Sequence, residues 1–141
     1  MKIYFAASIR GGRKDHNKYN ELIQFLSSKV EVLTEHVGDS SLQQNGEQNL
    51  SDKEIYERDL KWLESADAVI AEVTNPSLGV GYELGITEKL GKPALCLFDD
   101  SDHNRNLSAM ISGNHKITTF RYTSLDQAKE EIISFIHSLS K

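Results

Sequence analysis

The amino-acid sequence predicts an α/β protein with a five-stranded parallel sheet and helices on both faces. Short apolar runs alternate along the chain with segments of helical periodicity, as expected for strands joined by helical crossovers. Two of these runs are almost wholly apolar, which is typical of strands covered on both faces. The length of 141 residues fits one domain that spans residues 1–141. These observations favour Rossmann-like or flavodoxin-like winding.

The first elements are two strands with a helix between them. Residues 2–7 (KIYFAA) are expected to form the first strand, and the alternating residues 30–34 the second. Residues 38–50 are rich in Ser, Gln, Asn and Gly, which indicates a mobile surface loop. The helix is expected over residues 15–28, where apolar side chains recur at helical spacing at Tyr19, Leu22, Ile23 and Leu26.

A capped helix and a buried strand follow. Ser51 and Glu54 have the spacing of a capping box, which predicts a helix over residues 51–65. Residues 68–73 (AVIAEV) are nearly all apolar and predict the third strand.

The last third of the chain predicts two more strands and two more helices. A helix over residues 79–90 is expected to end at Gly91. Residues 94–98 predict a fourth, buried strand and residues 117–122 a fifth. A last helix follows Ser124, with one apolar stripe made of Leu125, Ala128, Ile132, Phe135, Ile136 and Leu139.

Composition excludes several classes of function. The net charge of −5 argues against binding to nucleic acid polymers or to anionic membranes. The single cysteine, Cys96, excludes an internal disulfide and a multi-cysteine metal site. No apolar run has the roughly 20 residues of a membrane span, and residues 1–9 do not resemble a signal peptide. We therefore expect a cytoplasmic protein, with the nucleus as a second compartment.

In such sheets, ligands bind beyond the carboxyl ends of the parallel strands, so we expect the functional residues in the loops there. After the first strand come Ser8, Arg10, Gly11 and Arg13. Two glycines and two arginines before a helix suit a phosphate, because backbone N–H groups and guanidinium groups both bind anions. A solvated turn with surface arginines is the alternative.

Glu83 follows a second glycine-containing loop, after the third strand. Ser77 offers a hydroxyl before the helix, and Gly79 and Gly81 allow a ligand close to the backbone. Glu83 is either a surface residue that complements the helix dipole or a carboxylate aimed at a ligand. In the second case we expect the helix N-terminus to keep Glu83 ionised, available as a nucleophile or base.

Asp59 is expected on the same helix face as Tyr56 and Leu63. A carboxylate on an apolar stripe is costly unless it has a partner. One interpretation pairs Asp59 with Arg58, with Lys61 or with solvent. The other places Asp59 and Glu83 in one cleft, as the carboxylate pair that cleaves a glycosidic bond.

Other residues carry weaker signals. His36 follows the second strand and is more often structural than catalytic there. Trp62 is most simply explained by packing in the core or in a dimer, and residues 107–110 form a short apolar patch. The other histidines, expected in loops or on helix surfaces without the spacing of metal ligands, are His16, His103, His115 and His137.

Several blocks of the chain are distinctive: residues 4–13 (YFAASIRGGR), 33–37 (LTEHV), 59–63 (DLKWL), 71–85 (AEVTNPSLGVGYELG), 96–98 (CLF) and 107–111 (LSAMI). They resemble 2′-deoxynucleoside 5′-monophosphate N-glycosidases of the nucleoside 2-deoxyribosyltransferase superfamily. The resemblance covers nearly the whole chain, and SLGVGYE is its most specific block. Differences lie mainly at residues 38–50, at 99–106 and at the C-terminus.

The resemblance implies hydrolysis of the base–sugar bond of deoxynucleoside monophosphates to a free base and 2-deoxyribose 5-phosphate, without a metal or organic cofactor. Glu83 matches the family nucleophile, whose covalent deoxyribosyl ester is resolved by water with net retention. Tyr4 matches the tyrosine beside that nucleophile. Asp59 matches an aspartate assigned to acid/base work or to sugar orientation.

The resemblance also implies a substrate-binding set and a homodimer. In the homodimer, Ser108 and Met110 of one protomer complete the site of the other. The binding set comprises Ser8, Arg10, Ser77 and Gly79 around the 5′-phosphate, Ile9 and His36 beside the base, and Phe5 and Gly11.

Three other functions remain open at this point. A deoxyribosyltransferase of the same superfamily is disfavoured by the phosphate-type loop, because the transferases act on unphosphorylated nucleosides. A CMP N-glycosidase of the same fold would accept ribose, and the sequence does not settle discrimination against the 2′-hydroxyl. A non-catalytic nucleotide sensor is disfavoured because Glu83, Asp59 and Tyr4 occur together.

Overall fold

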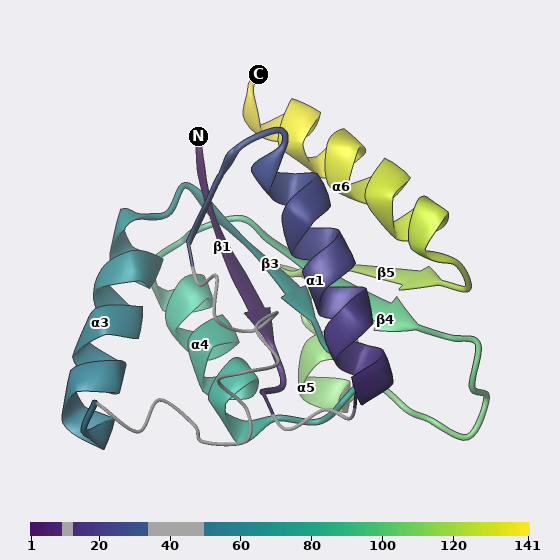
Figure 1. Ribbon diagram of the computed structural model, residues 1–141, viewed down its shortest axis with the longest axis horizontal. Coiled ribbons are helices and arrows are strands. Elements are labelled where there is room, and N and C mark those ends of the chain that lie inside the picture. Colours follow the sequence, from purple (N-terminus) through teal and green to yellow (C-terminus); the bar gives the residue numbers. More distant parts are fainter. Residues whose placement is uncertain (10–12, 34–49) are drawn as a thin grey trace.

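The computed structural model describes residues 1–9, 13–33 and 50–141, and it contains the expected parallel sheet (Figure 1). The five strands lie in the order β2-β1-β3-β4-β5, and every neighbouring pair is parallel. This is the flavodoxin-like order, so the predicted fold class is confirmed. The strands are β1 (Lys2–Ala7), β2 (Glu31–Leu33), β3 (Ala68–Glu72), β4 (Ala94–Asp99) and β5 (Thr118–Tyr122).

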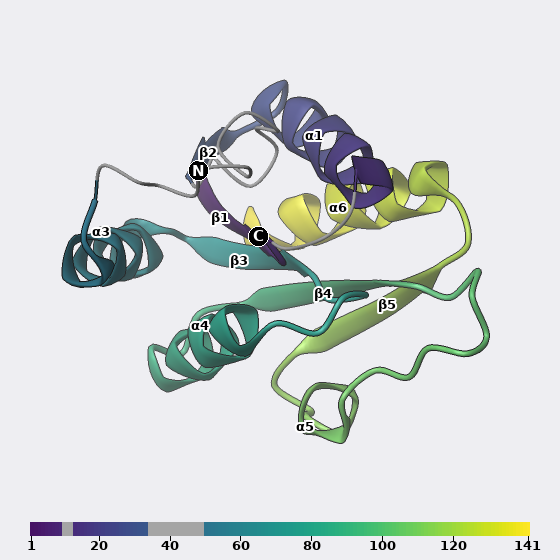
Figure 2. The same cartoon turned by 60° about the horizontal axis from the view of Figure 1, so that its bottom comes forward.

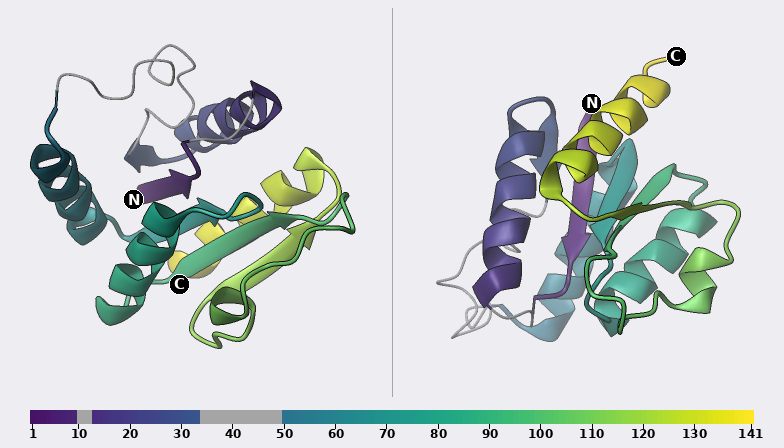
Figure 3. Two further views of the ribbon diagram at one scale, coloured as in Figure 1. Left: turned by 90° about the horizontal axis from the view of Figure 1, so that it is seen from below. Right: turned by 90° about the vertical axis from the view of Figure 1, so that its right-hand side faces the viewer.

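Helices cover both faces of the sheet, as Figure 2 shows. On one face lie α1 (Arg13–Ser27) and α6 (Leu125–Leu139). On the other face lie α3 (Asp52–Ser65) and α4 (Leu78–Lys89). A short helix, α5 (Ala109–Ser112), lies on the side of α4, and the side view in Figure 3 shows the three layers. None of the helices that the structure describes is long and apolar enough to cross a membrane.

Each face of the sheet has its own apolar core because successive strand residues point to opposite faces. In β3, Ile70 belongs to the core beneath α1 and α6, and its neighbour Ala71 to the core beneath α3 and α4. The apolar stripe predicted for α1 is buried against the sheet, and it consists of Tyr19, Leu22, Ile23 and Leu26. Full burial of one such aliphatic side chain contributes about 1.5–3 kcal/mol.

Local hydrogen bonds start and stop the helices where the sequence predicts. The Ser51 hydroxyl accepts from the backbone N–H of Glu54, and the Glu54 carboxylate accepts from the N–H of Ser51, so the capping box is confirmed. Ser77 and Ser124 cap α4 and α6 in the same way. After α4, Gly91 has a φ of 67°, a left-handed conformation that glycine adopts without strain.

The structure also corrects several expectations. β2 begins at Glu31 rather than at Val30. Thr34 and the loop expected over residues 38–50, apart from Leu50, lie outside the described residues. The patch at residues 107–110 leads into α5, whose four residues are too short for a periodic signal. His16 is buried in α1 rather than placed on its surface, and its ring makes an edge contact with Tyr19.

Candidate active site

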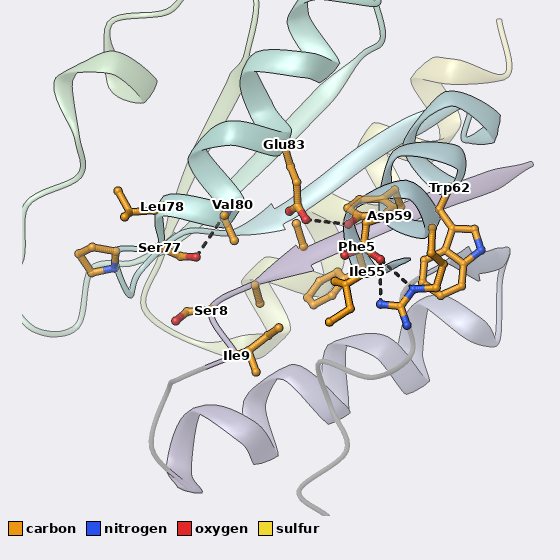
Figure 4. Close-up of a pocket in the computed structure, with 16 residues that line it drawn as sticks. Phe5, Ser8, Ile9, Ile55, Asp59, Trp62, Ser77, Leu78, Val80 and Glu83 are labelled. Carbon is orange, nitrogen blue, oxygen red and sulfur yellow. Dashed lines mark hydrogen bonds and ion pairs between the residues drawn. The ribbon is translucent and has the colours of Figure 1, made fainter. Parts of the chain in front are cut away.

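A cavity of about 520 Å³ opens at the carboxyl ends of β1 and β3 (Figure 4). The two strands are neighbours, but the chain leaves β1 for α1 on one face and β3 for α4 on the other. This switch point is where open α/β sheets bind ligands. The cavity is lined by Tyr4, Phe5, Ala6, Ala7, Ser8 and Ile9 of the β1 segment, by Ile55, Arg58, Asp59 and Trp62 of α3, and by Pro76, Ser77, Leu78, Gly79, Val80 and Glu83 of the α4 segment.

Glu83 is held in this cavity by Tyr4. The phenol of Tyr4 donates a hydrogen bond of 2.8 Å to Oε1 of Glu83. Tyr4 is buried in β1, and burial together with the charges of Glu83 and Asp59 raises the pKa of its phenol far above the usual value. Tyr4 is therefore a neutral donor at every physiological pH. One carboxylate oxygen of Glu83 is engaged by that donor, and the side chain lines the cavity.

The protonation of Glu83 differs from the expectation drawn from the sequence. The pKa of Glu83 is raised to about 7, chiefly by burial; the hydrogen bond from Tyr4 partly offsets this effect, and the charge of Asp59 adds to it. The helix N-terminus does not keep Glu83 ionised, because Glu83 is the sixth residue of α4 and the dipole effect fades after the first turn. A carboxyl with a pKa near 7 is present in both protonation states at neutral pH, so it can act as a general acid or base and, when ionised, as a nucleophile.

Asp59 faces the same cavity from α3 and also has a partner on its own helix. Nε and Nη2 of Arg58 donate to Oδ1 of Asp59 at 3.0 and 2.9 Å. The Arg58 guanidinium lies 4.6 Å from the centre of the Trp62 ring, a cation–π contact. Asp59 thus pairs with Arg58, as one interpretation predicted, and it lines the same cavity as Glu83, as the other predicted.

The α3 face differs from the one expected. Leu63 is buried as predicted, but Tyr56 is exposed and contacts Tyr82 of α4. Trp62 is half-buried: it packs against the edge of the core beneath α3 and α4, as predicted, and it also lines the cavity. Ile55, Asp59 and Trp62 have i, i+4, i+7 spacing, a signal that could have revealed this face.

The opposite end of the cavity is built from backbone and hydroxyl groups. The hydroxyl of Ser77 accepts a 3.3 Å hydrogen bond from the backbone N–H of Val80, which starts α4 at the cavity. Gly79 lies in the first turn, where a Cβ atom would approach nothing closer than the Ser77 hydroxyl at 3.8 Å. Ser8, at the end of β1, is buried. A helix N-terminus with flanking hydroxyls suits an anionic group.

Most of the residues predicted for the site meet in this cavity. Arg10, Gly11 and His36 lie outside the described residues. Ser108 and Met110 belong to the α5 segment and do not line the cavity of their own chain; Ser108 caps α5 and Met110 is 82% exposed. The predicted residues that line the cavity are Tyr4, Phe5, Ser8, Ile9, Asp59, Ser77, Gly79 and Glu83.

Comparison with known proteins extends these observations. A 5-hydroxymethyl-dUMP N-hydrolase of Mus musculus is 49% identical over 136 residues, which cover 96% of this chain and 77% of that protein. A protein of the same name from Esox lucius is 45% identical over 143 residues, covering 100% of this chain and 97% of that protein. Among solved structures, the CMP N-glycosidase of Clostridium botulinum has a TM-score of 0.66 at 19% identity, covering 94% of this chain and 98% of that one, which shows a shared fold.

The family model described as nucleoside 2-deoxyribosyltransferase matches residues 3–125. That range contains both carboxylates of the cavity and the loops that precede α1 and α4. The match and the identity to the two relatives confirm the resemblance seen in the sequence blocks. The chain belongs to the nucleoside 2-deoxyribosyltransferase family.

Proposed function

We propose that this protein is an N-glycosidase that hydrolyses 2′-deoxynucleoside 5′-monophosphates to a free base and 2-deoxyribose 5-phosphate. The observation that carries the proposal is Glu83, a carboxyl with a pKa of about 7 that is held by Tyr4 in a cavity shared with Asp59. The names of the relatives from Mus musculus and Esox lucius support the substrate class, since 5-hydroxymethyl-dUMP is such a nucleotide.

In the first step, ionised Glu83 attacks C1′ of the sugar. The C1′–N bond breaks, its electron pair leaves with the base, and a C1′–O ester to Glu83 forms. The transition state resembles an oxocarbenium ion, which a 2′-deoxy sugar forms more readily than a ribose. Tyr4 donates to Oε1 of Glu83, so Oε2 is the oxygen that we assign to the attack. Asp59 either orients the sugar as a carboxylate or enters this step protonated and gives its proton to the departing base, which leaves Asp59 as a carboxylate for the second step.

In the second step, water resolves the ester. The water oxygen bonds to C1′, Glu83 leaves as a carboxylate, and the water proton passes to a base, for which Asp59 is the candidate in the cavity. Two displacements at C1′ give net retention. Tyr4 stabilises the leaving carboxylate through the same hydrogen bond that it makes in the free protein.

The 5′-phosphate is assigned to the end of the cavity formed by Ser8, Ser77 and Gly79 at the start of α4. Arg10 and Gly11, outside the described residues, complete this assignment from the sequence. Contacts to a phosphate remote from C1′ supply binding energy that positions the sugar. The global charge of −5 is compatible with one bound phosphate, because local groups set the potential of a cleft.

We further propose a homodimer in which Ser108 and Met110 reach the partner's site. Met110 is 82% exposed and Leu78, which lines the cavity, is 97% exposed, so both apolar side chains are accessible to a partner subunit. Sedimentation velocity is expected to give a dimer, and Met110→Asp should shift it toward monomer and raise KM. The assignment would be contradicted if the unmodified protein were a monomer and Met110→Asp had the same KM.

A substrate panel tests the proposed function. The protein is incubated with 5-hydroxymethyl-dUMP, dGMP, deoxyguanosine, GMP and CMP, and base release is followed by chromatography. Release from the deoxynucleotides alone is expected. Activity that appears only when a second base is added would indicate a transferase, and release from CMP an enzyme that accepts ribose. Binding without turnover would indicate a nucleotide sensor.

A further inference from the structure

The side chain of Asn75 joins three segments of the chain. Asn75 lies between β3 and α4, and its Nδ2 donates to Oδ2 of Asp15 at 2.8 Å and to the hydroxyl of Tyr19 at 3.1 Å, both in α1. Its Oδ1 accepts from Nη1 of Arg105 at 2.7 Å, in the loop between β4 and α5. Both amide protons and the carbonyl oxygen of one side chain are thus used to connect separate segments.

One partner of Asn75, Asp15, also belongs to a partly buried ionic cluster around Lys18. Nζ of Lys18 lies 3.7 Å from Asp15, 3.6 Å from Glu72 and 3.6 Å from Asp99. Glu72 is fully buried and also accepts a 2.9 Å hydrogen bond from the hydroxyl of Tyr122. This cluster lies on the α1 face of the sheet, opposite the cavity that contains Glu83.

The Thr74 hydroxyl connects this cluster to the loop that carries Asn75. It donates to Oε1 of Glu72 and accepts a 2.8 Å hydrogen bond from the backbone N–H of Asp99. The residue before Asn75 is therefore anchored to two strands, β3 and β4. Such a support limits the movement available to Asn75 and makes its position precise.

Two of the three segments joined by Asn75 lead to proposed phosphate contacts of the same chain, and the third leads to Ser108, which we propose reaches the partner's site. Asn75 is two residues before Ser77, and Arg105 is three residues before Ser108. Asp15 lies in the first turn of α1, which directly follows the loop that begins at Ser8. None of the Asn75 contacts involves Glu83 or Asp59.

We propose that Asn75 is a positioning residue for the 5′-phosphate, and this inference rests on the proposed function. It holds the start of α4, the start of α1 and the Arg105 loop in one arrangement, so the phosphate contacts need not be ordered when the nucleotide binds. Contacts that are already ordered bind a ligand more tightly, because the entropy of ordering them is lost during folding and not on binding.

The chemistry of the site explains why an asparagine is suited to this position. A carboxylate at position 75 would face Asp15, and like charges at this distance repel. An alanine would leave Asp15, Tyr19 and Arg105 without the bonds that they make here. Of the short side chains, asparagine offers two donors and an acceptor without a charge.

Binding measurements with Asn75→Ala test this inference, with Tyr122→Phe as the matched control. Tyr122→Phe removes a hydrogen bond to Glu72 but leaves the bonds of Thr74 and all the contacts of Asn75 in place, so it should lower stability and leave nucleotide binding unchanged. Calorimetry with a deoxynucleoside monophosphate, the corresponding deoxynucleoside and 2-deoxyribose 5-phosphate measures affinity without requiring turnover. Asn75→Ala should weaken both phosphorylated ligands by about 10- to 100-fold and leave the deoxynucleoside unchanged.

Kinetics provide the second measurement. For the monophosphate, Asn75→Ala should raise KM by a similar factor and change kcat by less than about threefold. A loss of kcat or of folded protein with unchanged affinities would show that Asn75 is only a structural brace and would overturn the inference. Equal weakening of the deoxynucleoside would overturn it too.

If the unmodified protein binds nucleotides but releases no base, the proposed function fails, while the affinities still decide the role of Asn75. If it binds none of the phosphorylated ligands, both proposals are contradicted.

Discussion

Tyr4 and Glu83 are 79 residues apart in sequence, yet the phenol of Tyr4 donates a 2.8 Å hydrogen bond to Oε1 of Glu83. This bond joins β1 to α4 across the switch point of the sheet. It stabilises the ionised form of a carboxyl that burial otherwise keeps protonated. The pH dependence of the reaction should therefore report on this pair of residues.

Tyr4→Phe should move the ascending limb of the kcat/KM profile to higher pH. The limb of the unmodified protein is expected near pH 7, because Glu83 must be ionised to attack and has a pKa of about 7. Without the Tyr4 hydrogen bond that pKa rises, and kcat/KM at neutral pH should fall by about 10- to 100-fold. Initial rates of base release across a pH series measure both effects.

The matched control is Tyr122→Phe, which removes a phenol hydrogen bond to another buried carboxylate, that of Glu72. Its ascending limb should stay near that of the unmodified protein. An unchanged limb in Tyr4→Phe would mean that Glu83 is not the group that titrates, since phosphate ionisation of the substrate is the same in all variants.

Asp59→Asn should move the limb in the opposite direction. The charge of Asp59 raises the pKa of Glu83, so a neutral amide at position 59 lets Glu83 ionise at lower pH. The rate should fall by about 10²- to 10⁴-fold if Asp59 transfers protons. Asp67→Asn, at a surface carboxylate that accepts from the backbone of Lys2, should change neither property. A limb that moves to higher pH in Asp59→Asn would contradict the electrostatic account.

Glu83→Gln should stabilise the folded protein, and more so at alkaline pH. The folded-state pKa of Glu83 lies near 7, above its ordinary value of 4.5, so the stability of the unmodified protein falls as pH rises between these values. A neutral glutamine avoids that loss, and above pH 7 the gain should approach about 3 kcal/mol. Urea unfolding at about pH 5 and about pH 8 measures the difference.

Glu88→Gln provides the opposite case for that experiment. The side-chain amide of Asn114 donates to Glu88 and lowers its pKa, so its replacement should give no gain at alkaline pH. If Glu83→Gln gave equal stability changes at both pH values, burial of Glu83 would not be the source of its raised pKa.

Ser77→Ala should weaken nucleotide binding in addition to removing a helix cap. Ser77 and Ser124 cap their helices alike, with hydroxyl-to-amide distances of 3.3 and 3.4 Å. Each alanine variant should lose about 1 kcal/mol of stability. Only Ser77→Ala should raise KM for the monophosphate, since Ser124 does not line the cavity. Equal KM values for the two variants would remove Ser77 from the phosphate site.

The sequence predicted the elements better than their lateral arrangement. β3 and β4 are nearly all apolar, so their positions were predicted to within one residue. The flavodoxin-like strand order depends on pairing between distant segments, and apolar periodicity carries no information about it. α5 was missed because four residues hold no period.

For the candidate site, the sequence likewise predicted which residues take part better than it predicted their surroundings. Residue types and the family resemblance indicated Glu83, Asp59 and Tyr4, and the structure brings all three to one cavity. The pKa of Glu83 could not be predicted, because it depends on burial and on a partner from β1. The sequence predicted packing for Trp62, which the structure confirms, but not its place on the cavity wall, because one sequence does not show where the core face of α3 ends and the cavity face begins.

The most direct test of the central claim measures base release from a deoxynucleoside monophosphate by the unmodified protein, by Glu83→Ala and by Glu88→Ala. Glu88 lies in the same helix and outside the cavity, so its variant controls for changes in α4. We predict equimolar base and 2-deoxyribose 5-phosphate from the unmodified protein and from Glu88→Ala. Glu83→Ala should fold normally and release base more slowly by about 10³-fold or more. Release by folded Glu83→Ala at close to the full rate would contradict Glu83 as the nucleophile.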